Sequence, residues 1–502
     1  MGLGPPDRAV GPGVMTAAAI RRREVASPGT GARPVEVTGP QRPDGHGEIP
    51  WPVWRLALVI VFGAFMSGLD ASVVNVGLET IARDLDASLG QAQWAASGYL
   101  VALGVSLPVC GWLGRRVGVG RLWMAALAGF TVTSGLCALA GDVRWLVALR
   151  VLQGVAAGLL IPSGQTILGQ AVGPDRLGRV MASLGVAVTV APAIGPVVGG
   201  AVIHLGSWPW LFLVNLPFGA AGLRLGRRYV PRGERQDTGP LDRVGLVLVT
   251  AGLPLLVYGA TAWGEHRVLA TPPVLVPLAG GLVALGSFVR HSRSHPRPIL
   301  DLGLFARPAY AAACATTMCT GAALFGAALL FPLYFQIGRE AGVVDTGLSL
   351  ISLSVGTALL LPVSGRLVDR FGGGPVCVAG SLAAVATTVP FGLLETDADP
   401  RLVQGLLLVR GMAIALAAMP ATTAAYKAVT SAQLPDATTQ VNILLRLGGA
   451  LGGSVFAVIL AGQLPDGADA AFQTSFRWLT VASLLGSATA VWLAVAERRA
   501  AG

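Results

Sequence analysis

The sequence predicts an all-α polytopic membrane protein. Of its 502 residues, 53% are hydrophobic and only 12% are charged, whereas a soluble domain carries roughly twice that charged fraction. The mean hydropathy is +0.66. Apolar stretches of about 20 residues, long enough to cross a bilayer as helices, recur along the chain. The 68 glycines agree with this class, because glycine is more frequent in membrane helices than in soluble ones.

The first 50 residues differ from the rest. Residues 1–50 are rich in Gly, Pro and Arg and lack the apolar segment of a signal peptide, so we expect a disordered cytoplasmic tail. From Trp51 onward we predict fourteen spans, an even number that places both termini on one side. In order, they centre on residues 54–77, 92–113, 122–140, 144–168, 179–203, 209–226, 243–263, 272–290, 309–335, 346–366, 375–394, 402–424, 438–462 and 475–496.

The distribution of basic residues orients these spans. With the N-terminus inside, 27 of the 36 Arg and Lys residues fall in the tail and inner loops, six in outer loops and three within spans. The 26 acids divide evenly, with 13 inside, 12 outside and one, Asp70, within a span. The basic residues are distributed unevenly between the two sides of the membrane and the acidic residues evenly, which is the pattern of the positive-inside rule. We therefore expect both termini in the cytoplasm.

An internal repeat divides the chain. Gly111-Trp-Leu-Gly-Arg-Arg-Val-Gly118 follows the second span and Gly365-Arg-Leu-Val-Asp-Arg-Phe-Gly372 follows the tenth, and they share the frame G-x-L-x-x-R-x-G. Arg150 and Arg410 likewise stand early in the fourth and twelfth spans. Both copies lie on the same side, so the repeats are parallel.

The repeat sets the predicted domains. We assign residues 51–228 to a first six-helix bundle and 301–502 to a second six-helix bundle with a short cytoplasmic tail. Residues 229–300 then form an inserted pair of membrane helices with basic linkers.

Several function classes are disfavoured. The net charge of +10 suggests cytoplasmic loops rather than nucleic-acid binding. The five cysteines show no CxxC pairing, so they predict neither a disulfide frame nor a metal site. His291 and His295 have chelating spacing, but interleaved arginines favour a solvated basic face. Without a Walker motif, nucleophile elbow or HExxH, we expect no enzyme, no cofactor and an ion gradient as the driving force.

Asp70 is the residue that most needs a functional explanation. A charge at bilayer depth is costly unless it faces a cavity or a partner. Burial favours the protonated form of a carboxylate, so Asp70 could load and release a proton. The alternative is an interfacial residue that caps the next polar segment.

Motifs in several spans carry a family resemblance. The fourth span contains Arg150-Val-Leu-Gln-Gly-Val-Ala-Ala-Gly158, and the fifth contains Ala191-Pro-Ala-Ile-Gly-Pro-Val-Val-Gly-Gly200. Here the sequence resembles the major facilitator superfamily, specifically its fourteen-helix drug:proton antiporter branch, over residues 54–496. Further matches are Leu69-Asp70 with Val74-Asn75-Val76, Gln93-Trp94 with Tyr99-Leu100, and Trp208-Pro-Trp-Leu-Phe-Leu-Val-Asn-Leu-Pro-Phe-Gly219.

The fifth-span motif has both a structural and a functional interpretation. Prolines remove backbone donors and bend helices, and glycines allow close helix approach, so a packing contact alone would explain them. Two prolines four residues apart with flanking glycines favour a hinge and seal. The resemblance implies that this motif separates antiporters from importers by limiting leak. The hinge-and-seal residues are Pro192, Gly195, Pro196, Gly199 and Gly200.

Arg150 also has two interpretations. The resemblance implies proton coupling through Arg150, with Gln153 lining the central cavity, and we predict Asp70 and Arg150 as the coupling pair. The alternative is an arginine that extends from its helix end to the interface.

The loop motif departs from the family pattern. Arg115 stands where the family has an Asp before the arginine, and this departure puts the usual inner-gate contact in doubt. Asp369 in the second copy is retained. We predict a cytoplasmic gate of Arg116, Asp369 and Arg370.

These features together predict an exporter. We expect a transporter of the bacterial cytoplasmic membrane, a monomer, that exchanges drugs, antibiotics or related amphipathic metabolites for protons by alternating access. One intramembrane acid and three arginines favour neutral or weakly acidic substrates. A nutrient importer or symporter on the same fold and a non-transporting receptor remain alternatives. Candidate cavity residues are Gln93, Trp94, Tyr99, Gln153, Gln336 and Asn442.

Overall fold

The computed structural model describes residues 1, 49–266 and 270–501. The chain divides into two units, residues 1–47 and 48–502, and the second contains every helix described below. The expected disordered tail falls almost entirely outside the described residues. Within the described part of the chain the secondary structure is helical and includes no strand, which confirms the all-α class.

The first half of the second unit contains eight α-helices. Two of them, α2 and α7, are short and connect longer helices. The bounds are α1 (Trp51–Val76), α2 (Leu78–Asp84), α3 (Leu89–Val117), α4 (Val119–Cys137), α5 (Val143–Val172), α6 (Leu177–Leu205), α7 (Trp210–Leu213) and α8 (Asn215–Tyr229), with the 3-10 turn η1 (Pro174–Arg176) before α6.

The remaining helices comprise a central pair and six long helices. The central pair is α9 (Arg243–His266) and α10 (Pro272–Ser294). The second half contains α11 (Pro308–Leu333), α12 (Val343–Phe371), α13 (Gly373–Thr388), α14 (Pro400–Lys427), α15 (Leu434–Gln463) and α16 (Ala468–Ala501). Short turns between them are η2 (Leu302–Ala306), the π-helical η3 (Tyr334–Gly338), η4 (Pro390–Gly392) and η5 (Leu464–Asp466).

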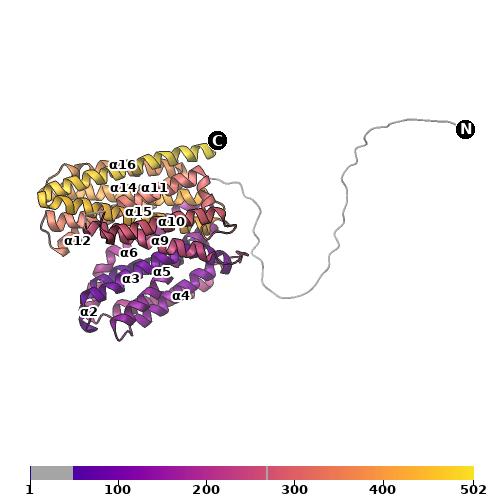
Figure 1. The fold of residues 1–502 in the computed structure, drawn as a ribbon, viewed down its shortest axis with the longest axis horizontal. Coiled ribbons are helices and arrows are strands. Elements are labelled where there is room, and N and C mark those ends of the chain that lie inside the picture. Colours follow the sequence, from indigo (N-terminus) through magenta and orange to yellow (C-terminus); the bar gives the residue numbers. More distant parts are fainter. Residues whose placement is uncertain (2–48, 267–269, 502) are drawn as a thin grey trace. The chain divides into compact units, whose positions relative to one another are not determined.

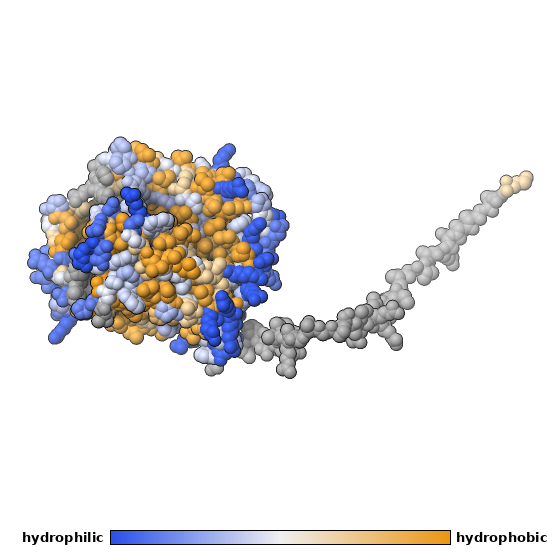
Figure 2. Space-filling model, turned by 90° about the horizontal axis from the view of Figure 1, so that it is seen from below, coloured by the Kyte–Doolittle hydropathy of each residue, from blue (hydrophilic) through white to orange (hydrophobic). Residues whose placement is uncertain are grey.

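The helices have the length and composition of membrane spans. Among the described residues, 11 helices are long and apolar enough to cross a bilayer. Helices α4, α6 and α8 cover the other three predicted spans without belonging to that set, so the count of fourteen remains a prediction. Figure 2 shows one face of the molecule, where hydrophobic residues cover the middle and hydrophilic residues gather toward the edges.

The long helices form two bundles (Figure 1). In the first, α3 packs on α5, α1 on α6 and α4 on α5, and in the second, α11 packs on α15, α12 on α14 and α13 on α16. The bundles meet where α6 packs on α12 and α3 on α15. Helix α9 packs on α10 and also touches both α3 and α15, so the central pair lies against the junction of the two bundles.

The two copies of the loop motif end in the same backbone conformation. Gly118 between α3 and α4 has φ of +93°, and Gly372 between α12 and α13 has φ of +84°. Residues with a side chain rarely adopt this left-handed region, so the last glycine of each motif allows a tight reversal between two helices.

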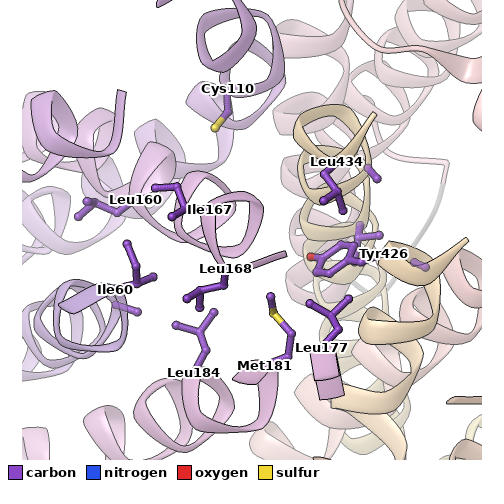
Figure 3. Packing of buried hydrophobic residues seen from close by; sticks show 14 of the residues in the cluster. Ile60, Cys110, Leu160, Ile167, Leu168, Leu177, Met181, Leu184, Tyr426 and Leu434 are labelled. Carbon is purple, nitrogen blue, oxygen red and sulfur yellow. The ribbon is translucent and has the colours of Figure 1, made fainter. Parts of the chain in front are cut away.

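A buried apolar cluster crosses from one bundle to the other. Figure 3 shows Leu168, Leu177 and Met181 of the first bundle in one cluster with Tyr426 and Leu434 of the second. All five side chains are buried. The bundles are therefore in van der Waals contact at this level of the molecule.

Candidate functional site

The structure brings Asp70 and Arg150 into a buried ion pair. Asp70 lies in the last third of α1 and Arg150 near the start of α5. Arg150 Nη1 is 2.5 Å from Asp70 Oδ2, and both side chains are 0% exposed. Both side chains are therefore paired inside the first bundle, and their depth in the membrane stays a prediction.

Two amides complete the environment of the carboxylate. Gln153 Nε2 donates to Asp70 Oδ1 at 3.1 Å, and Asn215 Nδ2 donates to the same oxygen at 2.7 Å. Asn215 also donates to Ser134 Oγ at 3.1 Å. Helices α1, α4, α5 and α8 thus converge on one carboxylate. Three side-chain donors, from Arg150, Gln153 and Asn215, therefore surround this carboxylate.

Arg150 is held by several groups besides Asp70. Its Nε donates to the Ala95 carbonyl at 3.0 Å, and its Nη1 also donates to Gln153 Oε1 at 2.7 Å. The guanidinium carbon lies 4.1 Å from the centre of the Tyr99 ring, a cation–π arrangement. Within the described residues, Nη2 has no hydrogen-bond partner. The guanidinium is therefore fixed in place with one donor group still available.

Glycines on α5 explain why Tyr99 can approach Arg150. A Cβ added at Gly154 would lie 2.4 Å from the Tyr99 carbonyl oxygen, and one added at Gly158 would lie 2.4 Å from the Leu103 carbonyl oxygen. Only glycine allows α3 to lie this close to α5 along this face. The motif that follows Arg150 thus sets the distance between the two helices.

The predicted hinge-and-seal segment packs against α1. Helix α6 is continuous through residues 192–200, including both prolines. A Cβ at Gly195 would lie 2.3 Å from Ser72 Oγ, and one at Gly199 would lie 3.1 Å from the Val73 carbonyl oxygen. A Cβ at Gly200 would meet nothing within 4 Å. Gly195 and Gly199 therefore allow close packing on α1, whereas Gly200 does not take part in it.

Polar contacts join the two bundles at the helix ends next to the basic loops. We call this set the inner seam. Asp369 of α12 accepts from the backbone N–H of Gly178 at 2.8 Å and from Arg179 Nε at 3.0 Å, and Lys427 Nζ lies 3.7 Å from it. The other members found among the described residues are Arg115–Asp436, Gln165–Tyr426, Gln165–Asn442, Thr166–Thr438 and Gln170–Ser431.

Arg115 makes its own contact in the inner seam, although the family has an acid at this position. It forms an ion pair with Asp436, whose side chain is 11% exposed. The predicted span at residues 438–462 left Asp436 outside any helix, whereas the structure includes it in one. Helix α15 starts at Leu434, four residues before the predicted span, and includes Asp436 in its first turn. Proline is tolerated in the first turn of a helix, so Pro435 lies within α15 rather than before it.

The other predicted gate residues contact their own half or the segment after it. Arg116 Nη1 donates to the Gly239 carbonyl at 3.2 Å, and its guanidinium lies over the Trp112 ring. Arg370 lies over the ring of Phe371. Of the three predicted gate residues, Asp369 takes part in the inner seam together with Arg115, Arg179 and Lys427, whereas the contacts described for Arg116 and Arg370 lie outside it, and the gating role stays a prediction.

The candidate cavity residues fall into three groups. Tyr99 and Gln153 are buried in the Asp70–Arg150 network, and Asn442 donates to Gln165 Oε1 at 2.6 Å in the inner seam. Gln93, Trp94 and Gln336 are exposed.

The sequence analysis assigned no role to Asn215, although this residue lies in the motif that runs from Trp208 to Gly219. Asn215 is 0% exposed and bridges Asp70 to Ser134. The available signal was a single amide within an apolar run, which by itself does not distinguish a helix–helix hydrogen bond from a functional one.

His291 and His295 lie beside Asp242, a neighbour that their spacing in the sequence did not predict. His291 Nε2 lies 2.8 Å from Asp242 Oδ1, and ligand atoms of Asp242, His291 and His295 lie within 4.8 Å of one another. The Asp242 carboxylate also accepts from the backbone N–H groups of Gly245 and Ile299. The expected solvated basic face is thus a hydrogen-bonded cap that joins the start of α9 to the end of α10.

Two opposing effects act on the pKa of Asp242. Burial raises it, but the hydrogen bonds from Gly245, His291 and Ile299 outweigh burial, and the pKa is lowered from its ordinary value of 3.8. Asp242 is therefore ionised at neutral pH and holds this cap together.

Comparison with known proteins gives consistent matches. Residues 60–457 match the family model described as Major Facilitator Superfamily. The chain is 33% identical over 448 residues to the multidrug resistance protein B homolog of Mycobacterium tuberculosis, covering 87% of this chain and 83% of that protein. It is 29% identical over 425 residues to the tetracenomycin C resistance and export protein of Streptomyces glaucescens, covering 83% and 77%. The solved proton:xylose symporter XylE has a similar fold, with a TM-score of 0.60, 15% identity and coverage of 88% of this chain and 94% of that one.

Proposed function

The chain belongs to the major facilitator superfamily, a family of membrane transporters rather than enzymes, and we propose that it exports small amphipathic molecules in exchange for protons. The observation that carries this proposal is the occluded Asp70–Arg150 pair with its amide donors. A buried carboxylate with a single arginine partner is a group whose protonation changes the charge balance of the membrane interior.

In the proposed cycle, Asp70 is the proton carrier. While Asp70 is ionised, Arg150 and two amides hold it and the helices around it stay together. When Asp70 takes a proton, Arg150 loses its counter-charge and its guanidinium is free to bind another group. Removing one charge of a buried ion pair leaves the other charge uncompensated, which is energetically costly. Protonation of Asp70 therefore favours a different arrangement of α1 and α5. Release of the proton on the other side restores the pair.

The inner seam is the second part of the cycle. In the proposed topology its contacts lie on the cytoplasmic side, where Arg115–Asp436 and the Asp369 cluster keep the bundles together. Access from the cytoplasm requires these contacts to break. The described state therefore corresponds to a transporter closed toward the cytoplasm.

The membrane placement belongs to the same proposal. We place the chain as a monomer in the bacterial cytoplasmic membrane, with both termini in the cytoplasm and the proton gradient, rather than a bound cofactor, as the driving force. The basic residues of the inner loops support this orientation.

The proposed substrates follow from the relatives and the accessible residues. The relatives are named for multidrug resistance and for export of tetracenomycin C. Gln93, Trp94 and Gln336 remain exposed and offer amide and indole groups to an aromatic, weakly polar molecule. We propose neutral or weakly acidic amphipathic compounds as substrates, with antibiotics and other secondary metabolites as the first class to test.

The test is transport by the purified full chain in liposomes. A pH-sensitive dye in the lumen reports proton movement while a panel that begins with tetracenomycin C is followed by fluorescence or mass. We expect substrate and protons to move in opposite directions and substrate flux to stop when the pH gradient is dissipated. Movement in the same direction would show a symporter and overturn antiport.

Variants assign the coupling to Asp70. Asp70→Asn should reduce proton-coupled flux to background, whereas Glu79→Gln, which changes an exposed acid of α2, should leave the flux unchanged. Equal coupled flux from Asp70→Asn and the wild-type chain would remove Asp70 from the mechanism.

A further inference from the structure

The second bundle contains a buried arginine whose partners are all neutral. Arg410 of α14 is 2% exposed. Its Nη1 donates to Thr388 Oγ1 and, at 3.4 Å, to the Ala384 carbonyl, and its guanidinium carbon lies 5.2 Å from the centre of the Phe331 ring. Its Nε has no hydrogen-bond partner among the described residues. Carbonyl, hydroxyl and ring faces stabilise a cation only partly, so the positive charge lacks a counter-charge.

Comparison of the two bundles shows what is missing. Arg410 is the repeat counterpart of Arg150, and the cavity beside it is lined by α11, α13, α14 and α16, which are the repeat counterparts of the helices α1, α4, α5 and α8 that meet around Asp70. In the first bundle α1 supplies the acid Asp70. In the second, the residues of α11 beside the arginine include Ala323 and Leu324, which carry no charge.

A cavity lies beside Arg410 where the first bundle has its carboxylate and amides. Its volume is about 40 Å³, and its polar lining comprises Arg410, Thr320, Ser381 and Ser483. Ser381 and Ser483 donate their hydroxyls to carbonyls of their own helices. The donors left to face the cavity are the Arg410 guanidinium and the Thr320 hydroxyl.

The size of the cavity restricts its occupant. A site for one water needs roughly 10–15 Å³ on this measure, so a cavity of about 40 Å³ has room for one small ion together with water. A drug-sized molecule needs a pocket of roughly 300 Å³ or more. A lone cation with free donors attracts an anion, and the remaining lining of alanine, leucine, isoleucine, glycine and one cysteine disfavours a strongly hydrated or multivalent one.

We propose that this cavity binds one small monovalent anion, of the size and charge of chloride, as the counter-ion of Arg410. The anion accepts hydrogen bonds from the Arg410 guanidinium and the Thr320 hydroxyl and holds α11, α13, α14 and α16 together. The site is separate from Asp70 and does not depend on the proposed direction of transport.

Thermal unfolding of the purified full chain tests the site. Its 11 tryptophans report unfolding while chloride replaces gluconate at constant ionic strength and pH. We expect the unfolding midpoint to rise saturably with chloride, on the order of 2 °C at tenfold excess over the dissociation constant, and to rise similarly with bromide. A midpoint that does not depend on the anion would overturn the proposal and leave water as the occupant.

Two substitutions on α14 identify the residue responsible. Arg410→Gln removes the proposed ligand and should abolish the chloride-dependent rise. Arg401→Gln removes an exposed arginine from the start of the same helix and should keep the rise at its wild-type size. A chloride response that survives in Arg410→Gln would place the anion elsewhere and refute the proposed site.

A second pair of variants keeps the test decisive if Arg410→Gln does not fold. Leu324→Asp supplies a carboxylate from α11 beside Arg410, which reproduces the arrangement of the first bundle. We expect this variant to unfold at the same temperature in chloride and gluconate, because the counter-charge is built in. Leu324→Asn has the same shape without the charge and should still respond to chloride. Equal chloride responses from the two variants would contradict the proposal.

Discussion

The guanidinium of Arg150 lies against the face of the Tyr99 ring, and the Tyr99 hydroxyl lies 3.1 Å from Ser67 Oγ. Tyr99 belongs to α3, Arg150 to α5 and Ser67 to α1. One aromatic side chain thus contacts the cation of the ion pair and the helix that carries its acid.

This relationship predicts a difference between two substitutions. Tyr99→Phe keeps the ring over Arg150 and loses the hydrogen bond, so we expect a loss of about 1 kcal/mol in the free energy of unfolding. Tyr99→Leu also loses the cation–π contact, worth about 2 kcal/mol for a desolvated cation, and should impair transport as well. Unfolding midpoints and flux in liposomes measure both effects. If Tyr99→Phe were as damaging as Tyr99→Leu, the hydroxyl rather than the ring would stabilise Arg150.

The glycines offer a matched pair for the packing argument. Gly154→Ala places a methyl group 2.4 Å from the Tyr99 carbonyl and should force α3 away from α5, at about 1–3 kcal/mol in the free energy of unfolding. Gly200→Ala meets open space and should be neutral or stabilise by about 0.5 kcal/mol. Thermal unfolding of the two variants side by side checks this. A Gly200→Ala variant less stable than Gly154→Ala would show that Gly200 has a packing role absent from this state.

The inner seam predicts a charge-swap rescue. Arg115→Asp places two acids together and Asp436→Arg places two arginines together, and each should cost about 3–5 kcal/mol, as loss of a partner does in a buried pair. The double variant restores one acid and one base, with the acid now on α3. We expect it to recover most of the transport lost by either single variant. A double variant as inactive as the singles would mean that the orientation of the pair, not its charge complementarity, closes the seam.

The cap at Asp242 predicts a pH-dependent difference in stability. Because the pKa of this carboxyl is lowered in the folded state, its contribution is fully present above the unfolded value of 3.8 and is lost as the pH falls through the folded value. Asp242→Asn should therefore lower the unfolding midpoint at pH 7, and the difference from wild type should shrink below about pH 4. Asp237→Asn, at an exposed acid in the same segment, is the control. A difference that grows toward low pH would contradict the sign of this shift.

The sequence predicted the site in part. Asp70 was identifiable because a lone acid in an apolar run is costly, and the structure pairs its carboxylate with Arg150, while their role in proton coupling stays a prediction. Asn215 was not identifiable as its partner, because nothing in the spacing of an amide on α8 specifies contact with a residue 145 positions earlier. That pairing depends on how α1 and α8 pack, which is a property of the bundle.

Asp436 illustrates a different limit. A proline and an acid before an apolar run resemble a loop, yet both are favourable in the first turn of a helix. The backbone N–H that proline lacks has no partner in the first turn in any case, and the acid interacts favourably with the helix dipole. A boundary error of four residues hid a buried ion pair. By contrast, Arg410 was correctly assigned to a span. Its uncharged surroundings could not be predicted, because they depend on which residues of α11 and α16 pack beside it.

Helix α9 packs on α3 of one bundle and α15 of the other, and Leu107, Val249 and Ile443 share one buried cluster there. If the inner seam opens as proposed, Leu107 and Ile443 would move apart and expose apolar surface to lipid chains or water. In the proposed cycle the central pair would therefore lose buried apolar surface on opening, and this loss would favour return to the closed state.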